Sequence, residues 1–204
     1  MRDQDGIEAI LDYWFGDIGA GFEVSQQQHA RWFGGSKEVD VAIKQQFGTL
    51  VEQALQGLLQ HWWQVPGGVL ALVLLLDQFT RNIYRGTARA FAGDSQAKAM
   101  VVAALQQQLD QQLTFIQRSF FYLPLEHSEV LEDQQRSVEL FEQLLQQAPV
   151  AGQARLQSSL KYAVHHRDII QRFGRFPHRN KALGRQSTVA ELDFLMQGGA
   201  RFGQ

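Results

Sequence analysis

The amino-acid sequence predicts an all-α fold in which successive helices pack as antiparallel pairs. The 204 residues include only four prolines, and leucine, alanine and glutamine outnumber the β-branched residues that favour strands. Apolar residues recur every three or four positions along most of the chain, and no segment alternates strictly between apolar and polar residues. Because the connections between helices are short, neighbours should run antiparallel. We expect one helical domain over residues 1–197, followed by a loose tail over 198–204.

The first third of the chain contains three expected helices, each with a start signal. Asp3 or Asp5 can cap a helix that ends at a glycine after residue 15, and Ser25 can cap a short helix that ends at a Gly-Gly pair. Ser36 then starts a longer helix. Its inward face is predicted from apolar residues at helical spacing, namely Val39, Ile43, Phe47, Leu50, Val51, Ala54 and Leu58.

Residues 66–86 form the stretch around which the rest of the chain is expected to be organised. Pro66 suits the first position of a helix, and residues 69–76 are apolar without interruption, which predicts a fully buried helix. In the second half of this stretch, a helix that turns by about 100° per residue would place the polar residues within an arc of about 140° of its circumference. They are Asp77, Gln78, Arg81, Asn82 and Arg85.

The remaining helices are predicted from caps and breaks in the second half of the chain. Asp94 and Ser128 can each cap a helix, and a shorter helix over 113–122 should stop before Pro124. After Pro149, a long helix should reach Phe173 and end at Gly174 in the left-handed conformation. A loop over 175–186 follows, and Thr188 with Glu191 then forms a capping box for a short final helix.

Residues 161–185, which we call the basic hook, carry an uneven share of the charge. They contain seven lysines and arginines and one acidic residue, Asp168, whereas the whole chain has a net charge of −2. The hook must therefore either pair with acidic residues of the remaining chain or bind an anion.

Two groups of residues could act as acids or bases. Glu126, His127 and Glu129 follow the break at Pro124, and they could perform acid–base chemistry or pair with the basic hook. On the last long helix, His166 lies at the centre of the apolar side and is expected in the core. His165 lies at the edge of that side, near Arg172, and is the better candidate for a pocket.

Several classes of function are excluded or disfavoured. The chain has no cysteine, which excludes disulfides, thiol catalysis and cysteine-ligated metals. It also has no phosphate-binding glycine loop, nucleophile elbow or zinc signature, so neither a metal nor a cofactor is expected. The pI of about 6.3 and the absence of a broad basic face argue against nucleic acid. No apolar run is long enough for a membrane span and no signal peptide is apparent, so we expect a cytoplasmic protein.

Three blocks resemble an uncharacterised bacterial domain-of-unknown-function family with an all-helical, tetratricopeptide-like fold. They are LLDQFTRNIYRGTARAFAGD (75–94), RSFFYLPLEHSE (118–129) and HRDIIQRFGRFPHRNKALGRQST (166–188). The resemblance covers nearly the whole chain. It implies the fold and assigns no activity or catalytic residue.

Two functions of different class remain open. The favoured one is a helical module that binds a small anionic ligand or an acidic peptide segment, through Asp77, Gln78, Arg81, Asn82, Arg85, Arg172, Arg175 and Arg179. The alternative is a hydrolase or lyase, in which Glu126 or Glu129 acts as base and His127 or His165 transfers protons, while Arg81 or Arg172 stabilises negative charge.

In either case, the separate polar blocks should converge. We expect Glu126 or Glu129 to lie within about 4 Å of an arginine, because a buried guanidinium needs an acceptor. The candidate arginines are Arg81, Arg85, Arg172 and Arg175.

Overall fold

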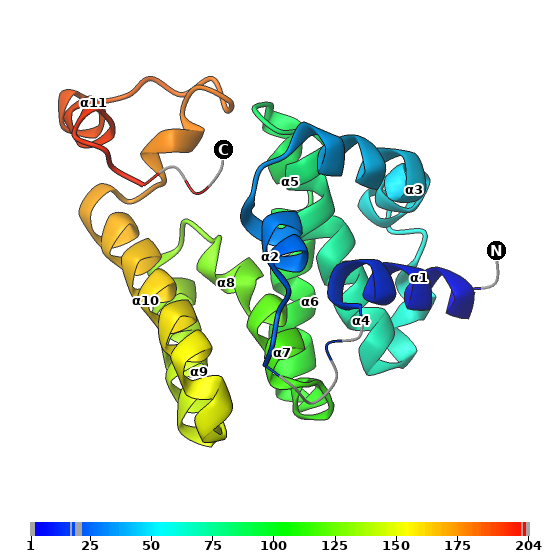
Figure 1. Ribbon diagram of the computed structural model, residues 1–204. Helices are drawn as coiled ribbons and strands as arrows, with labels where there is room; N and C mark the ends of the chain where they lie inside the picture. The colour runs from blue at the N-terminus through cyan, green and yellow to red at the C-terminus, as the bar shows by residue number, and fades with distance from the viewer. Residues whose placement is uncertain (1–2, 17, 19–21, 201, 203–204) are drawn as a thin grey trace.

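The computed structural model describes residues 3–16, 18, 22–200 and 202, which fold into helices joined by short connections (Figure 1). No strand occurs among these residues, so the prediction of an all-α fold is confirmed. The tetratricopeptide-like arrangement stays a prediction, as do the domain and tail boundaries. No helix in the described part of the chain is long and apolar enough to cross a membrane.

Helices α1 (Asp3–Phe15), α2 (Gln26–Phe33) and α3 (Lys37–Leu55) form the N-terminal third. The predicted caps of the second and third helices are confirmed, since Ser25 accepts from Gln28 N and Ser36 accepts from Val39 N. The expected aspartates both lie within the first turn of α1, where negative charge favours the helix dipole. A 3-10 turn, η1 (Gln60–Gln64), leads into the centre of the fold.

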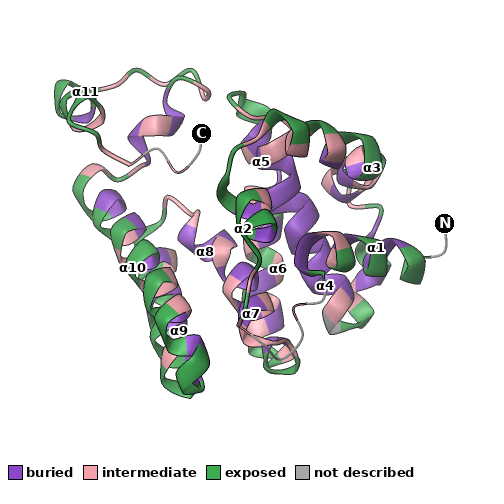
Figure 2. Cartoon of the chain, in the orientation of Figure 1, coloured by how far each residue is buried: buried purple, intermediate pink, exposed green. Residues whose placement is uncertain are grey.

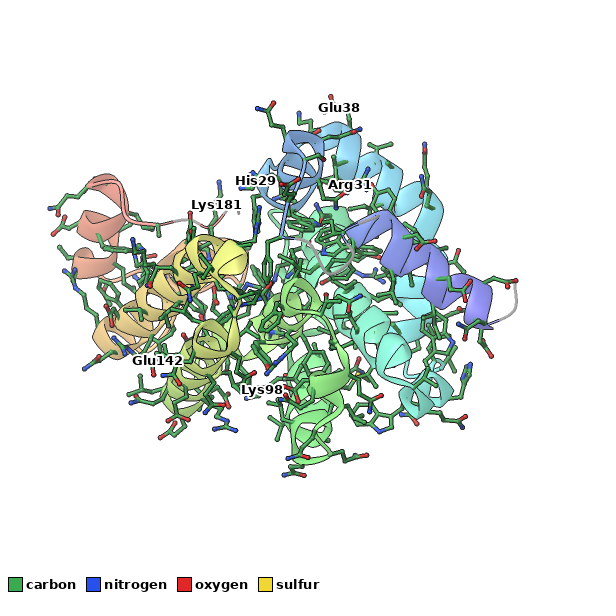
Figure 3. All side chains as sticks on the ribbon, turned by 60° about the horizontal axis from the view of Figure 1, so that its bottom comes forward. His29, Arg31, Glu38, Lys98, Glu142 and Lys181 are labelled. Carbon is green, nitrogen blue, oxygen red and sulfur yellow. The ribbon has the colours of Figure 1, made fainter. Side chains whose placement is uncertain are left out.

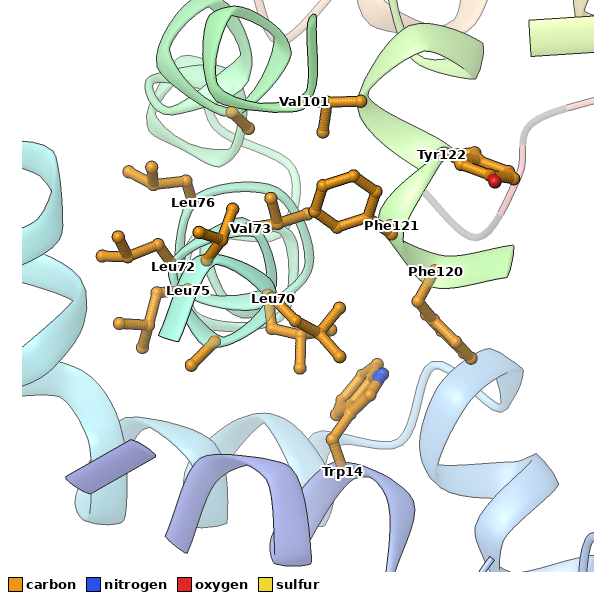
Figure 4. Close-up of a cluster of buried hydrophobic side chains, with 14 of the residues drawn as sticks. Trp14, Leu70, Leu72, Val73, Leu75, Leu76, Val101, Phe120, Phe121 and Tyr122 are labelled. Atoms are coloured by element: carbon orange, nitrogen blue, oxygen red, sulfur yellow. The ribbon is translucent and has the colours of Figure 1, made fainter. Parts of the chain in front are cut away.

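The central helix passes through the middle of the domain and has three consecutive parts. These are α4 (Pro66–Val73), a π-helical segment η2 (Leu74–Phe79) and α5 (Thr80–Ile83). The apolar residues 69–76 are almost completely inaccessible, which confirms that this helix is buried (Figure 2). Figure 4 shows Trp14 of α1 and Phe121 of α7 pointing towards its aliphatic side chains. The π-helical segment was not predicted.

The second half consists of α6 (Asp94–Gln106), α7 (Phe115–Phe121), α8 (Leu123–Glu126), α9 (Leu131–Gln147), α10 (Val150–Phe173) and α11 (Val189–Met196), with 3-10 turns η3 (Ala88–Phe91), η4 (Leu109–Gln112) and η5 (Pro177–Arg179). The stop at Gly174, with a φ of 70°, and the capping box at the start of α11 are confirmed.

Two predicted caps are wrong. Asp94 is the first helical residue of α6, because Gly93 occupies the cap position, and the Asp94 carboxylate is used elsewhere. Ser128 lies before the cap position of α9, which Val130 occupies, and its hydroxyl donates to Asp133.

Helices α9 and α10 lie side by side as an antiparallel pair, and the chain then turns through η5 to α11 at one end of this pair (Figure 1). Most buried apolar residues belong to one core around the central helix. A second, smaller core is formed by apolar residues of the basic hook itself, namely Ile169, Ile170 and Phe176. Charged side chains such as Glu38 and Glu142 project outward from the ribbon (Figure 3).

Candidate functional site

Five charged or titratable residues from distant parts of the chain meet beside the central helix. This polar cluster consists of Asp77, Arg81, Asp94, His127 and Arg179. Arg81 Nη2 lies 3.3 Å from Asp77 Oδ1 and 3.0 Å from Asp94 Oδ1. His127 Nδ1 lies 2.7 Å from Asp77 Oδ1, and Arg179 Nη1 lies 3.6 Å from Asp94 Oδ2. The structure therefore brings the polar end of the central helix, the turn after α8 and the basic hook together.

The backbone of α6 places Asp94 against the central helix. Gly93 packs so closely that a Cβ atom at this position would lie 2.3 Å from the carbonyl oxygen of Leu76. Real Cβ atoms do not approach a backbone oxygen this closely, so only glycine fits here. The next residue, Asp94, is consequently held at the first position of α6, within reach of Arg81.

Asp77 is completely buried and is surrounded by hydrogen-bond donors. Its Oδ1 faces His127 and Arg81, and Gln78 Nε2 donates to its Oδ2. Burial opposes ionisation of Asp77, but His127 and Arg81 outweigh it and hold the pKa of this carboxyl well below its usual range. Because Asp77 is ionised, His127 Nδ1 must donate its proton to Asp77, and Nε2 of the neutral imidazole is an acceptor.

Arg81 and Arg179 both lie over the ring of Phe91, with their Cζ atoms 5.2 and 4.9 Å from its centroid. Arg179 is buried and donates through Nη1 to the carbonyl oxygen of His127 at 2.9 Å. The Nε atoms of Arg81 and Arg179, and Nδ1 of the neighbouring His178, are buried and have no hydrogen-bond partner among the described residues. Buried polar nitrogens without a partner are costly, so these three nitrogens are candidates for ligand contacts.

Burial also changes the protonation of the groups around the two arginines. It lowers the pKa of Arg179 to about 9, with help from Arg81, so this guanidinium remains protonated at pH 7. Burial and the charge of Arg179 lower the pKa of His178 to about 3, so its imidazole is neutral. Burial raises the pKa of Asp94, and the nearby Asp77 raises it further against the opposing effect of Arg81.

The predicted polar face of the central helix is divided between two sites. Asp77, Gln78 and Arg81 belong to the polar cluster or contact it, whereas Asn82 and Arg85 turn towards α3. There, Asn82 Nδ2 donates to Asp40 at 2.8 Å, and Arg85 makes bonds of 2.8 and 3.0 Å to the same carboxylate. This second set joins the central helix to α3.

The expectation that Glu126 or Glu129 pairs with Arg81, Arg85, Arg172 or Arg175 is wrong. Glu126 is buried and lies 3.0 Å from Nδ1 of His166, which confirms His166 as a core residue. Glu129 forms two bonds with Arg185, at 2.6 and 2.9 Å, and accepts from Phe176 N at 2.8 Å. Both glutamates therefore hold the hook in place.

His165, the predicted pocket histidine, is exposed and contacts the ring of Phe202. It does not reach the polar cluster.

The basic hook is largely neutralised within the protein. Four of its five arginines pair with carboxylates: Arg167 with Asp168, Arg175 with Glu191, Arg179 with Asp94 and Arg185 with Glu129.

Arg172 and Arg175 lie away from the polar cluster. Arg172 is exposed and stacks on Phe173 and Phe194. Together with Arg175 and Glu191 it lines an open depression of about 410 Å³ on the surface. Among the arginines of the hook, Arg179 is the one that contacts the polar cluster.

Three residues of the site were not predicted from the sequence: Phe91, Asp94 and His178. The sequence predicts a helix cap at Asp94, although this residue also ends one of the three blocks quoted above, directly after Gly93. His178 directly precedes Arg179 and lies in the loop predicted over 175–186, where a histidine after a proline is typical of a turn. Within the described residues, no group of three or more histidine, aspartate or glutamate side chains could hold a metal ion.

Comparison with known proteins identifies similar proteins whose function is unknown. Residues 10–199 match a family model described as a bacterial protein of unknown function (DUF924). A solved structure of a protein of unknown function from Agrobacterium tumefaciens, ATU0120, is 33% identical, with a TM-score of 0.81. The match covers 96% of this chain and 99% of that one. No curated protein matches this sequence.

Proposed function

The chain belongs to the DUF924 family of bacterial proteins of unknown function, and from this premise we propose that it binds a small anion at the polar cluster. One observation carries the proposal: the buried Nε atoms of Arg81 and Arg179 and Nδ1 of His178 lack hydrogen-bond partners among the described residues. An anion that accepts from the two guanidiniums would satisfy these donors, and a carboxylate or phosphate matches their planar geometry.

The depth of the cluster favours a small anion over an acidic peptide. The Arg81 and Arg179 side chains are only 10% and 6% exposed, so a ligand must fit within the protein rather than across its surface. Phe91, which lies beneath both guanidiniums, adds an apolar wall. In such a site, charge-assisted hydrogen bonds are stronger than in water.

The test measures binding of sulfate, inorganic phosphate and acetate by calorimetry, at constant ionic strength maintained with chloride. We expect saturable binding by the wild-type protein and a loss of at least tenfold in Arg179→Met. Arg136→Met provides the matched control, because Arg136 forms an exposed pair with Glu139 on α9 and should leave binding unchanged. The proposal fails if the wild-type protein binds none of the three anions, or if the control variant loses as much affinity as Arg179→Met.

The pair of Asp77 and His127 favours an acid–base enzyme as a second candidate. A buried carboxylate fixes Nδ1 of the imidazole and leaves Nε2 as an acceptor, which is the arrangement of a positioned general base. If the protein is a hydrolase, His127→Gln should abolish turnover of carboxylic or phosphate esters, whereas His29→Gln, at an exposed histidine of α2, should not. Turnover that survives His127→Gln would exclude this candidate.

A further inference from the structure

The Asp94 carboxylate lies between the two guanidiniums of the proposed anion site. Its Oδ1 is 3.0 Å from Arg81 Nη2, and its Oδ2 is 3.6 Å from Arg179 Nη1. Its side chain is 23% exposed, more than those of Arg81, Arg179, Asp77 and His127, which range from 0% to 14%. An anion that arrives from solvent therefore reaches Asp94 before it reaches the arginines.

The formal charges of the cluster are already balanced. Arg81 and Arg179 contribute two positive charges, and Asp77 and Asp94 contribute two negative charges. A further anion would leave a net negative charge in a largely buried site, which is unfavourable unless a carboxylate moves away or takes up a proton. Asp77 cannot serve, because it is fully buried and held by three donors. Asp94 can, because it reaches the surface.

We propose that a small anion binds by replacing the Asp94 carboxylate between Arg81 and Arg179, and that binding takes up about one proton. This inference rests on the proposed function and adds its regulation: Asp94 is an internal competitor that weakens anion binding as the pH rises. The ligand class is a compact carboxylate, sulfate or phosphate group that can occupy the position of the Asp94 carboxylate at the Nη atoms and extend to the unpartnered Nε atoms of Arg81 and Arg179.

The groups around Asp94 are consistent with proton uptake at this residue. Asp77 and Arg81 face it from the central helix, His127 from the turn after α8 and Arg179 from η5. On its own helix, Lys98 is paired with Asp133 instead. Burial raises the pKa of Asp94, and an anion placed on its two arginines would remove the attraction that opposes this rise. Neutralisation of Asp94 then restores the charge balance for a singly charged anion, and for sulfate it lowers the excess negative charge by one.

The test uses sulfate, because it exchanges no proton between pH 6 and 8. Calorimetry in two buffers with different ionisation enthalpies gives the number of protons taken up for each sulfate bound. For the wild-type protein we expect about one proton, and an affinity that falls about tenfold for each pH unit above neutrality. Asp94→Asn should bind sulfate at least tenfold more tightly at pH 8, without proton uptake.

Two further variants keep the test decisive. Asp94→Glu retains the carboxylate and should retain proton uptake, and Asp168→Asn removes an exposed carboxylate and should behave as the wild-type protein. Binding by the wild-type protein without proton uptake, or weaker binding by Asp94→Asn, would overturn this inference and leave the proposed function intact. Failure of both the wild-type protein and Asp94→Asn to bind sulfate would overturn this inference, and the proposed function falls as well if neither phosphate nor acetate binds.

Discussion

Asp77→Asn tests whether the polar cluster is a buried network that stabilises the fold. The substitution keeps the size of the side chain and removes a fully buried charge that faces Arg81 and His127. Removing one partner of a buried ion pair costs about 3–5 kcal/mol, because the remaining charge loses its compensation. Arg81 keeps Asp94 and the amide oxygen still accepts from His127, so we expect the lower end, about 3 kcal/mol. For a chain of this length, that lowers Tm by about 6–12 °C.

The assay is thermal and urea unfolding, followed by circular dichroism at pH 7 and again at decreasing pH. The folded-state pKa of Asp77 lies below its ordinary value of 3.8, so this group stabilises the fold above that pH. The stabilisation is lost as the pH falls below 3.8 towards the folded-state pKa, and the difference between the wild-type protein and Asp77→Asn should shrink there. Asp168→Asn, at an exposed ion pair, is the control and should change little. A loss below about 1 kcal/mol at pH 7 would refute the buried network.

Three further substitutions test the packing around the site, each by the free energy of unfolding in urea. His166→Ala removes a buried, paired imidazole and should cost about 1–3 kcal/mol, while anion binding by the folded protein persists. A loss of binding without a loss of stability would contradict the role of His166 in the core. Glu129→Gln should cost about 1–3 kcal/mol at neutral pH. Burial raises the pKa of Glu129, but the hydrogen bonds from Arg185 and Phe176 N, with the charge of Arg185, outweigh it and lower the folded-state pKa, so the cost should fade as the pH drops below 4.5. A cost that does not vary with pH would count against the pair. Gly93→Ala should cost about 1–3 kcal/mol because its Cβ would meet the backbone oxygen of Leu76. Gly48→Ala is the control and should be neutral or stabilising, because Gly48 lies in the middle of α3 and has room for a Cβ atom. Equal effects of the two substitutions would argue against the close contact.

The fold was predictable because its signals are local. Ser25, Ser36 and Thr188 cap helices as expected, and the uninterrupted apolar residues 69–76 are the most buried part of the chain. These features depend on residues a few positions apart, which a sequence displays directly. The π-helical segment carries no such signal, because its residues would also fit an ordinary α-helix.

The site was only partly predictable because its partners are distant in sequence. The sequence indicated that Arg81, His127 and Arg179 belong to polar blocks that meet, but it could not indicate which carboxylate each one contacts. Asp94 could serve as a helix cap or as an ion-pair partner, and only the packing of Gly93 on the central helix decides between them. Likewise, Glu129 pairs with Arg185 instead of the arginines that were expected. The hook folds back onto Glu129, which also accepts a hydrogen bond from Phe176 N.

The π-helical segment sets where along the central helix the site tolerates a change in the length of the chain. Its turns contain more residues than α-helical turns, so deletion of one residue between 74 and 79 could convert the segment to ordinary α-helix without exposing its apolar side chains. A deletion within the α-helical turns of the central helix, such as those of α4, would instead rotate every side chain beyond it by about 100° relative to the residues before it. Arg81 would leave Asp94, although no residue of the polar cluster had been replaced. Insertions and deletions in the α-helical parts of the central helix, which substitution scans do not sample, should therefore separate relatives that retain the site from those that have lost it.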